Sequence, residues 1–193
     1  MSVRNILVYG DEKLRRPARQ VLKVSAKIKS LVKDLRDTMY AANGVGLAAP
    51  QVGEDLRVFV IDVADEDQPP NPIIFINPVI IKKSGATNSY EGCLSFPDAY
   101  TDVRRYEYVK IKALDINGRM FVMEANDGTL LARAIQHEFD HLDGILFIDH
   151  ARNRFKADKE LAEKKLLPID PTRLIDEPQL EEAIQVKSAE PAE

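Results

Sequence analysis

Two histidines stand four residues apart in the stretch His-Glu-Phe-Asp-His at positions 137–141. Side chains four apart share one face of a helix, so His137 and His141 can offer two imidazoles to one metal ion. Glu138 projects beside them, where a carboxylate can take a proton from metal-bound water. The chain has only three histidines, and two of them fall here. The pattern predicts a metal-dependent hydrolase; the alternative is a solvated helix with two surface histidines.

A hydrolytic site of this type usually has three protein ligands and one open position, so a third ligand must come from elsewhere. A further histidine six residues after the motif would extend it, but that position is Phe147. Glu160, nineteen residues after His141, would give a gluzincin-type metallopeptidase, although its charged surroundings are typical of a solvated helix face. The only cysteine, Cys93, lies in a small-residue segment upstream. Its thiolate would complete a tetrahedral set with one vacancy, whereas an ordinary lone cysteine is a small buried hydrophobe.

Helices must hold these side chains in place. Apolar residues recur at helical spacing from residue 130 to 142, with Gly128-Thr129 before them and Gly144 after them. A second helix is predicted to follow Ser25 as N-cap and to end at Asn43-Gly44, because apolar residues repeat at i, i+3, i+4 and i+7 between them. A third, heavily charged helix is predicted over about 153–167.

Strands are predicted where β-branched and aliphatic residues cluster between turns. Four such runs are 57–63, 73–81, 108–116 and 119–125. The last two flank Asn117-Gly118, a strong signal for a tight hairpin. The sequence therefore predicts an α+β fold. Mostly antiparallel sheets wrap around a central metal-binding helix, with further helices on the N-terminal and C-terminal sides.

Composition predicts one domain with an acidic tail. The chain has 193 residues, 45% of them hydrophobic, and a formal charge of −4. Residues 168–193 contain seven acidic and two basic residues, a net of −5, which leaves about +1 for 1–167 (24 acidic, 25 basic). We predict a single catalytic domain over 1–167 and a flexible tail over 168–193.

The same features bear on partners and location. The nearly neutral body calls for neither nucleic acid nor a membrane as a partner. The first residues contain no apolar run long enough for a signal peptide or a membrane span. A lone cysteine cannot form an internal disulfide and suits a reducing cytosol, so we expect a cytoplasmic protein.

Three segments together resemble the peptide deformylase family. They are Gly-Val-Gly-Leu-Ala-Ala-Pro-Gln at 44–51, Glu-Gly-Cys-Leu-Ser at 91–95 and Gln-His-Glu-Phe-Asp-His at 136–141. They occur in the family's order and at similar spacing, and the resemblance covers roughly residues 3–165. Each segment alone is moderate evidence, whereas the three in register are specific.

The resemblance implies a function and a set of roles. The family removes the N-formyl group from the initiator methionine of nascent chains and releases formate. By resemblance, Cys93, His137 and His141 hold one divalent metal ion, and Glu138 is the general base and acid. The ion is expected to be Fe2+, with Zn2+, Ni2+ or Co2+ able to occupy the same ligands. The side chain of Gln51 and the backbone N–H of Leu94 would stabilise the oxyanion, and four residues are assigned to substrate binding: Gly44, Val45, Gly46 and Glu91.

Two other hypotheses stay open on the sequence alone. One is the gluzincin-type peptidase with Glu160 as third ligand. The other is a metal-binding interaction protein without catalytic activity, for which four protein ligands would be expected. A basic cluster, Arg152, Arg154, Lys156 and Lys159, is typical of a solvated helix face and could also contact the ribosome.

Overall fold

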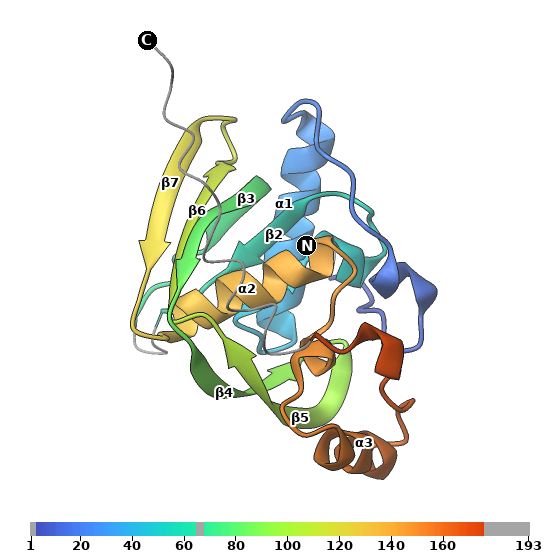
Figure 1. Cartoon of the computed structure of the whole chain (residues 1–193). Helices are drawn as coiled ribbons and strands as arrows, with labels where there is room; N and C mark the ends of the chain where they lie inside the picture. The colour runs from blue at the N-terminus through green and yellow to red at the C-terminus, as the bar shows by residue number, and fades with distance from the viewer. Residues whose placement is uncertain (1–2, 65–67, 176–193) are drawn as a thin grey trace.

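The computed structural model describes residues 3–64 and 68–175 and shows an α+β fold (Figure 1). Five antiparallel strands form one sheet in the order β1-β2-β3-β6-β7, and β4 and β5 form a separate two-stranded sheet. Helix α2 lies between the two sheets, so the predicted fold class is confirmed. The strands are β1 Gly46–Ala48, β2 Val58–Ile61, β3 Ile73–Ser84, β4 Thr87–Cys93, β5 Phe96–Arg105, β6 Tyr108–Leu114 and β7 Met120–Ala125.

Three α-helices and four short 3-10 helices complete the described part of the chain. The predicted starts of two helices agree with the structure: α1 begins directly after Ser25, and α2 begins directly after Thr129. Among the described residues, no helix has the length and apolarity needed to cross a bilayer. The helices are α1 Ala26–Ala41, α2 Leu130–Leu142, α3 Arg154–Glu163, η1 Glu12–Arg15, η2 Ala49–Val52, η3 Phe147–His150 and η4 Pro171–Arg173.

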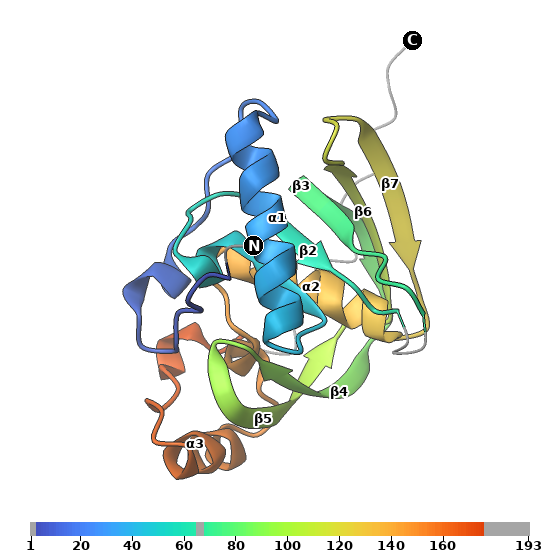
Figure 2. The same cartoon turned by 180° about the vertical axis from the view of Figure 1, so that it is seen from behind.

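Strands β1 and β2 of the five-stranded sheet are covered on both faces, which explains the continuous apolar run of β2, whereas β7 exposes alternate residues. Alternate residues of β2 point to opposite faces. Val58 and Val60 pack with the apolar side of α1, whereas Phe59 and Ile61 pack with α2. Figures 1 and 2, seen from opposite sides, show α2 and α1 on the two faces of this sheet. Helix α2 is therefore held on one side by an apolar core.

A third apolar cluster joins the β4–β5 hairpin to the C-terminal part of the domain. Phe96 stacks on Tyr9, with ring centroids 4.5 Å apart, and meets Phe147 edge-on at 4.9 Å. Ile169, which the sequence placed in the tail, is buried in the same cluster. Ile175 then donates its backbone N–H to the carbonyl of Asp149 at 2.8 Å. The rest of the predicted tail, 176–193, lies outside the described residues.

The structure contains elements that the sequence did not predict. The hairpin β4–β5 was missed, and the small-residue segment that contains Cys93 is the end of β4. Polar residues at inward-facing positions of this hairpin, such as Ser89 and Thr101, obscure the apolar–polar alternation that marks a strand. Helix α3 was predicted to run to 167 but ends at Glu163, because Lys165 turns the chain with a positive φ of 59°.

Candidate active site

Helix α2 presents its motif toward the β4–β5 hairpin. The Thr129 side chain accepts a hydrogen bond from the N–H of Ala132 and caps the first turn. Three turns of helix then bury the motif side chains: His137 is 9% exposed, Glu138 4% and His141 1%. Surface histidines on a solvated helix are thus excluded.

Cys93 joins the two histidines. A register shift between Gly92 and Cys93 interrupts the β4–β5 ladder at this point. The thiol sulfur lies 3.4 Å from Nε2 of His141, and the ligand atoms of Cys93, His137 and His141 all lie within 4.8 Å of one another. Glu160 belongs to no such group among residues 3–64 and 68–175; its carboxylate lies 3.4 Å from the backbone N–H of Tyr100. The gluzincin hypothesis is therefore wrong about the third ligand.

The donor set fits a divalent transition metal. One thiolate and two imidazoles suit zinc or ferrous iron, and three protein ligands leave a coordination position open. The open position also argues against a purely structural site, which would be closed by four protein ligands. Among the described residues, no other cluster of potential metal ligands of this kind occurs.

A buried ionic network orients His137. Its Nδ1 lies 3.0 Å from Glu91 Oε2, so the ionised carboxylate accepts the Nδ1 proton and leaves Nε2 for the metal. Arg105 donates to both oxygens of Glu91, from Nε at 3.0 Å and Nη2 at 2.9 Å. Burial alone would raise the pKa of Glu91, but the Arg105 charge and the hydrogen bonds from His137 and Arg105 hold it well below its usual range. The predicted substrate residue Glu91 therefore lies behind a metal ligand.

The network continues to a residue that the sequence left without a role. Arg105 also pairs with Asp140, whose Oδ2 lies 3.0 Å from Nε2 of His150. The side chain of His150 is only 10% exposed, so the third histidine of the chain also belongs to this network. Arg105 and Asp140 were missed altogether. The inward alternation of Ala99, Val103 and Arg105 on β5 could have revealed Arg105, had that strand been predicted.

Glu138 is held by the close approach of β1. A side-chain carbon on Gly46 would lie 2.4 Å from Glu138 Oε1, so only glycine fits beside the carboxylate. The other oxygen, Oε2, is buried without a hydrogen-bond partner among the described residues. Burial raises the pKa of Glu138 to about 7. A carboxyl group in this condition is suited to accept and return a proton near neutral pH.

Gln51 is fixed in one orientation. Its Oε1 accepts the N–H of Ala48 at 2.8 Å, which turns Nε2 toward the hairpin. There Nε2 donates to Ser95 Oγ at 3.2 Å and lies 3.5 Å from the sulfur of Cys93. Leu94 follows Cys93 and packs over Gly44, where an added side-chain carbon would lie 2.6 Å from Leu94 Cδ1.

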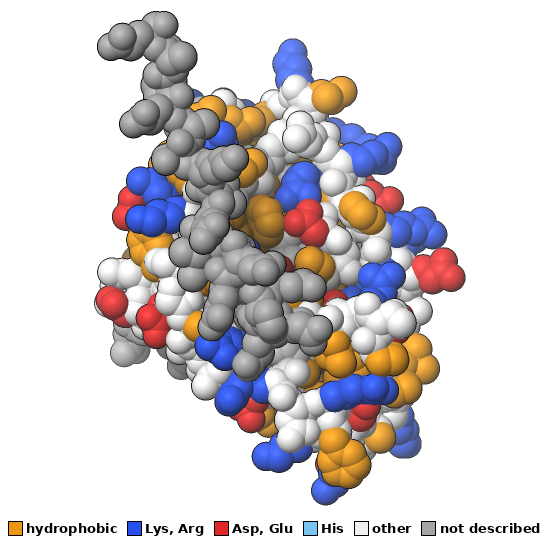
Figure 3. Space-filling view, viewed as in Figure 1, with side chains coloured by type: hydrophobic (Ala, Val, Ile, Leu, Met, Phe, Trp, Pro, Cys, Tyr) orange, Lys and Arg blue, Asp and Glu red, His pale blue; other side chains and the backbone are white. Residues whose placement is uncertain are grey.

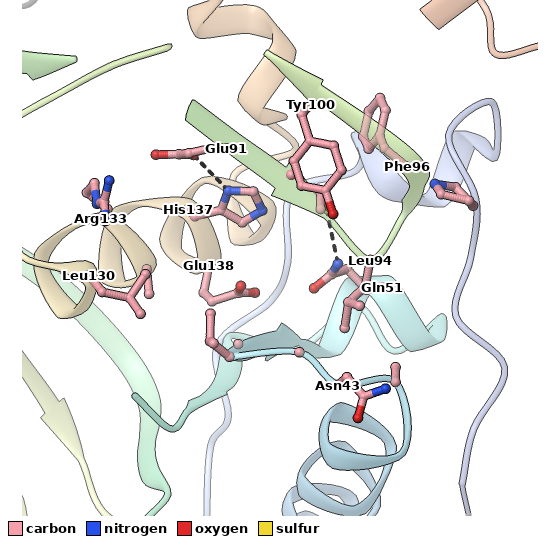
Figure 4. Close-up of a pocket in the computed structure, with 18 of the residues that line it drawn as sticks. Asn43, Gln51, Glu91, Leu94, Phe96, Tyr100, Leu130, Arg133, His137 and Glu138 are labelled. Carbon is pink, nitrogen blue, oxygen red and sulfur yellow. Dashed lines mark hydrogen bonds and ion pairs between the residues drawn. The ribbon is translucent and has the colours of Figure 1, made fainter. Parts of the chain in front are cut away.

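These residues surround one cleft of about 560 Å³. In Figure 4, Glu138 and His137 point into it from α2, Gln51 approaches from η2, and Tyr100 lies above Gln51. Val45 is 44% exposed, and Leu130, predicted on the apolar stripe of the helix, is 45% exposed at the rim of the cleft. Nine of the ten predicted site residues line the cleft; the tenth, His141, lies at its base as the third ligand of the metal group.

A half-buried cysteine and two buried helical histidines beside a carboxylate with an unpaired oxygen, in one cleft, define a metal-dependent hydrolase. Residues 3–157 match the family model described as polypeptide deformylase. The chain belongs to the polypeptide deformylase family.

Known peptide deformylases are similar to this chain in sequence and in structure over most of its length. It is 51% identical over 150 residues to "Peptide deformylase 1" of Clostridium perfringens, covering 78% of this chain and 99% of that protein. A crystal structure of a peptide deformylase from Legionella pneumophila superposes with a TM-score of 0.77 at 42% identity, over 85% of this chain and 96% of that chain. A crystal structure of a peptide deformylase from Synechococcus elongatus in complex with actinonin superposes with a TM-score of 0.80 at 39% identity. The match covers 88% of this chain and 90% of that chain.

Proposed function

We propose the following catalytic and binding roles for the residues around the cleft. The protein is a peptide deformylase, a metal-dependent enzyme that removes the formyl group from N-formylmethionyl peptides. One observation carries the proposed roles: the unpaired carboxylate oxygen of Glu138 is buried beside the Cys93–His137–His141 group. In a chain without such a group, an uncompensated buried carboxylate would be costly.

Cys93, His137 and His141 would hold the ion, which when bound would supply Lewis acidity that lowers the pKa of water and polarises a carbonyl oxygen. Glu138 accepts a proton as water attacks the formyl carbon. It then returns that proton to the methionine nitrogen as the bond between this nitrogen and the formyl carbon breaks. The products are formate and a peptide with a free amino group.

Two donors stabilise the oxyanion that forms on the formyl oxygen. One is Nε2 of Gln51, whose direction is fixed by the Ala48 N–H on its other end. The second is the backbone N–H of Leu94, directly after the metal-binding cysteine. Such preorganised donors typically contribute about 10²- to 10³-fold each in kcat.

The substrate peptide lies along residues 44–46. Gly44 and Gly46 let its backbone approach Leu94 and Glu138, and Val45 offers exposed apolar surface to the methionine side chain. Glu91 supports binding from behind, through His137.

We propose that the ion in the cell is Fe2+, on the resemblance to the family; the mixed thiolate–imidazole set suits iron and zinc alike. Protein purified without oxygen from iron-replete cells should carry about one iron per chain by elemental analysis. Stoichiometric zinc in the same preparation would contradict the iron assignment and leave the ligand set untouched.

The decisive test of function is formate release from formyl-Met-Ala-Ala beside the unformylated peptide Met-Ala-Ala. We expect formate from the first and no cleavage of peptide bonds in either. Cys93→Ala should lose both bound metal and formate release, whereas the matched Glu160→Ala variant should keep both. If Glu160→Ala lost the metal, or if peptide-bond cleavage prevailed, the proposed function would be wrong.

We further propose a transient contact with the ribosome, where formylated nascent chains emerge in the cytoplasm. Arg152, Arg154, Lys156 and Lys159 are all exposed on and before α3. Figure 3 shows several Lys and Arg side chains at the end of the molecule where Figure 1 places α3. Cosedimentation with ribosomes should weaken when these four residues are changed to Ala, with no loss of formate release from a free tripeptide.

A further inference from the structure

Exposed apolar side chains gather around the mouth of the active-site cleft. Tyr90 is 65% exposed and Tyr100 48%, and both line the cleft together with Cys93. Val45 and Leu130, which also line the cleft, are 44% and 45% exposed. An apolar patch of this kind, continuous with a binding cleft, indicates a surface that a ligand covers.

The fold fixes the two tyrosine rings relative to each other. Gly92 pairs with Tyr100 across the hairpin, and Tyr90 pairs with Asp102, so the rings are diagonal neighbours on one face. Their centroids lie 5.7 Å apart, and their planes differ by only 18°. The Tyr100 ring also rests on the backbone of Gly92, where an added side-chain carbon would lie 2.4 Å from Cε1.

Figure 4 shows on which side of the cleft this surface lies. Tyr100 overhangs the cleft above Gln51, whereas Leu130 and Arg133 line it from the side of α2. Successive side chains of an extended peptide point in opposite directions. A peptide in the cleft therefore presents some of its side chains to α2 and the alternate ones to the tyrosines.

The strand also sets a length scale. Tyr90 stands three residues before Cys93 on β4, which is roughly 10 Å of extended chain. A peptide whose formyl carbon lies beside Cys93 spans the same length with about three residues. The side chains that reach the level of the tyrosines are those of its second and third residues.

We infer that Tyr90 and Tyr100 form a specificity platform that favours formylmethionyl peptides with an aromatic side chain at the second or third residue. This inference rests on the proposed function. A nearly parallel pair of exposed rings can stack against a third flat ring, and such contacts are worth about three- to tenfold in an equilibrium or specificity constant. Stacking needs the ring of Tyr100 and not its hydroxyl group.

The test compares kcat/KM for formate release from formyl-Met-Ala-Ala, formyl-Met-Phe-Ala and formyl-Met-Ala-Phe. The wild type should favour at least one Phe-containing peptide by about three- to tenfold over the first. Tyr90→Ala and Tyr100→Ala should each bring that ratio close to one, and Tyr100→Phe should retain it. Met120→Ala, which changes an exposed apolar residue on β7, should also retain the ratio.

Because the readout is a ratio between substrates, a variant that merely loses stability or metal lowers all three rates and leaves the ratio unchanged. An unchanged ratio in both Ala variants, or equal rates for all three peptides with the wild type, would overturn the platform alone. Absence of formate from every peptide would overturn the proposed function, and the inference with it.

Discussion

The carboxylate of Glu138 has one oxygen against Gly46 and the other buried without a partner among the described residues. Glu138→Gln keeps the shape of the side chain and removes its capacity to accept a proton. We expect the variant to retain bound metal while kcat/KM for formate release falls by at least about a hundredfold. Glu160→Gln, the same exchange on α3, should leave the rate unchanged. Formate release by Glu138→Gln at the wild-type rate would show that another group is the base.

For individual residues, the sequence was informative where spacing along the chain alone determines how two side chains lie relative to each other. A separation of four places His137 and His141 on one face of any helix, so that pair was predictable. The third ligand was not settled by spacing, because Cys93 and Glu160 were both at acceptable distances along the chain. Only the hairpin β4–β5 brings Cys93 to the histidines, and the supporting contacts of Arg105 and Asp140 depend on the same hairpin.

At the scale of elements, the approach of β1 to α2 depends on Gly46. The missing side chain there leaves room for Glu138, so Gly46→Ala must displace either the strand or the carboxylate. We expect a loss of at least about tenfold in kcat/KM with metal content preserved. In a Glu138→Gln background the same substitution should cost almost nothing further, because both changes act through one carboxylate. Additive losses in the double variant would indicate a separate role for Gly46.

A second contact ties α1 to the end of β2. The Tyr40 hydroxyl donates to Asp62 Oδ2, which also accepts the N–H of Asn71 at 2.8 Å, and Ala64 donates to Oδ1 at 3.0 Å. Burial alone would raise the pKa of Asp62, but these hydrogen bonds outweigh it and leave the pKa below its ordinary value of 3.8. A carboxyl group whose pKa is lowered by folding stabilises the protein above its unfolded pKa, and this contribution is lost as pH falls through the folded pKa.

The consequence can be measured with Asp62→Asn. At pH 7 the variant should unfold with a free energy about 1–2 kcal/mol lower than that of the wild type, because charged hydrogen bonds are replaced by neutral ones. Urea titrations from pH 7 to pH 2.5 should show the two proteins converging below about pH 4. A constant gap across the whole range would contradict the assignment of a lowered pKa to Asp62.

Elements differed in how well the sequence predicted them. Strands β2, β3, β6 and β7 were predicted because β-branched and aliphatic residues cluster in each of them, and Asn117-Gly118 marked the turn between the last two. The strands β4 and β5 were not predicted, since polar residues such as Ser89 and Thr101 occupy inward-facing positions and Gly92 and Pro97 interrupt the pattern. Their pairing is supported by distant partners, notably Arg105 with Asp140 on α2, and no local window contains that information.

At the scale of the whole molecule, the chain's first and last described segments meet. Tyr9 donates its hydroxyl to the carbonyl of Pro168 at 3.1 Å, and Ile169 is 2% exposed in the cluster with Leu14. Ending the chain at Leu167 removes this contact. We expect the free energy of unfolding to fall by about 2–3 kcal/mol, as for the loss of one buried isoleucine with its neighbours. A chain ending at Ile175 should unfold like the full-length protein in the same urea titration.

Equal stability of the chain ending at Leu167 would show that Ile169 contributes little, and the domain boundary predicted from composition would then stand. Composition could not reveal this contact, because a single isoleucine within an acidic segment gives no periodic signal.

The three proposed metal ligands come from two elements that are far apart along the chain. Cys93 ends β4 and His137 lies on α2, forty-four residues later. An ion shared by them acts as a reversible cross-link that closes a loop of that length, which for a covalent link corresponds to about 4 kcal/mol of unfolded-state entropy. Removal of the ion should therefore lower the thermal stability of the protein as well as its activity. The melting temperature should drop on chelation in the wild type and stay insensitive to chelator in Cys93→Ala.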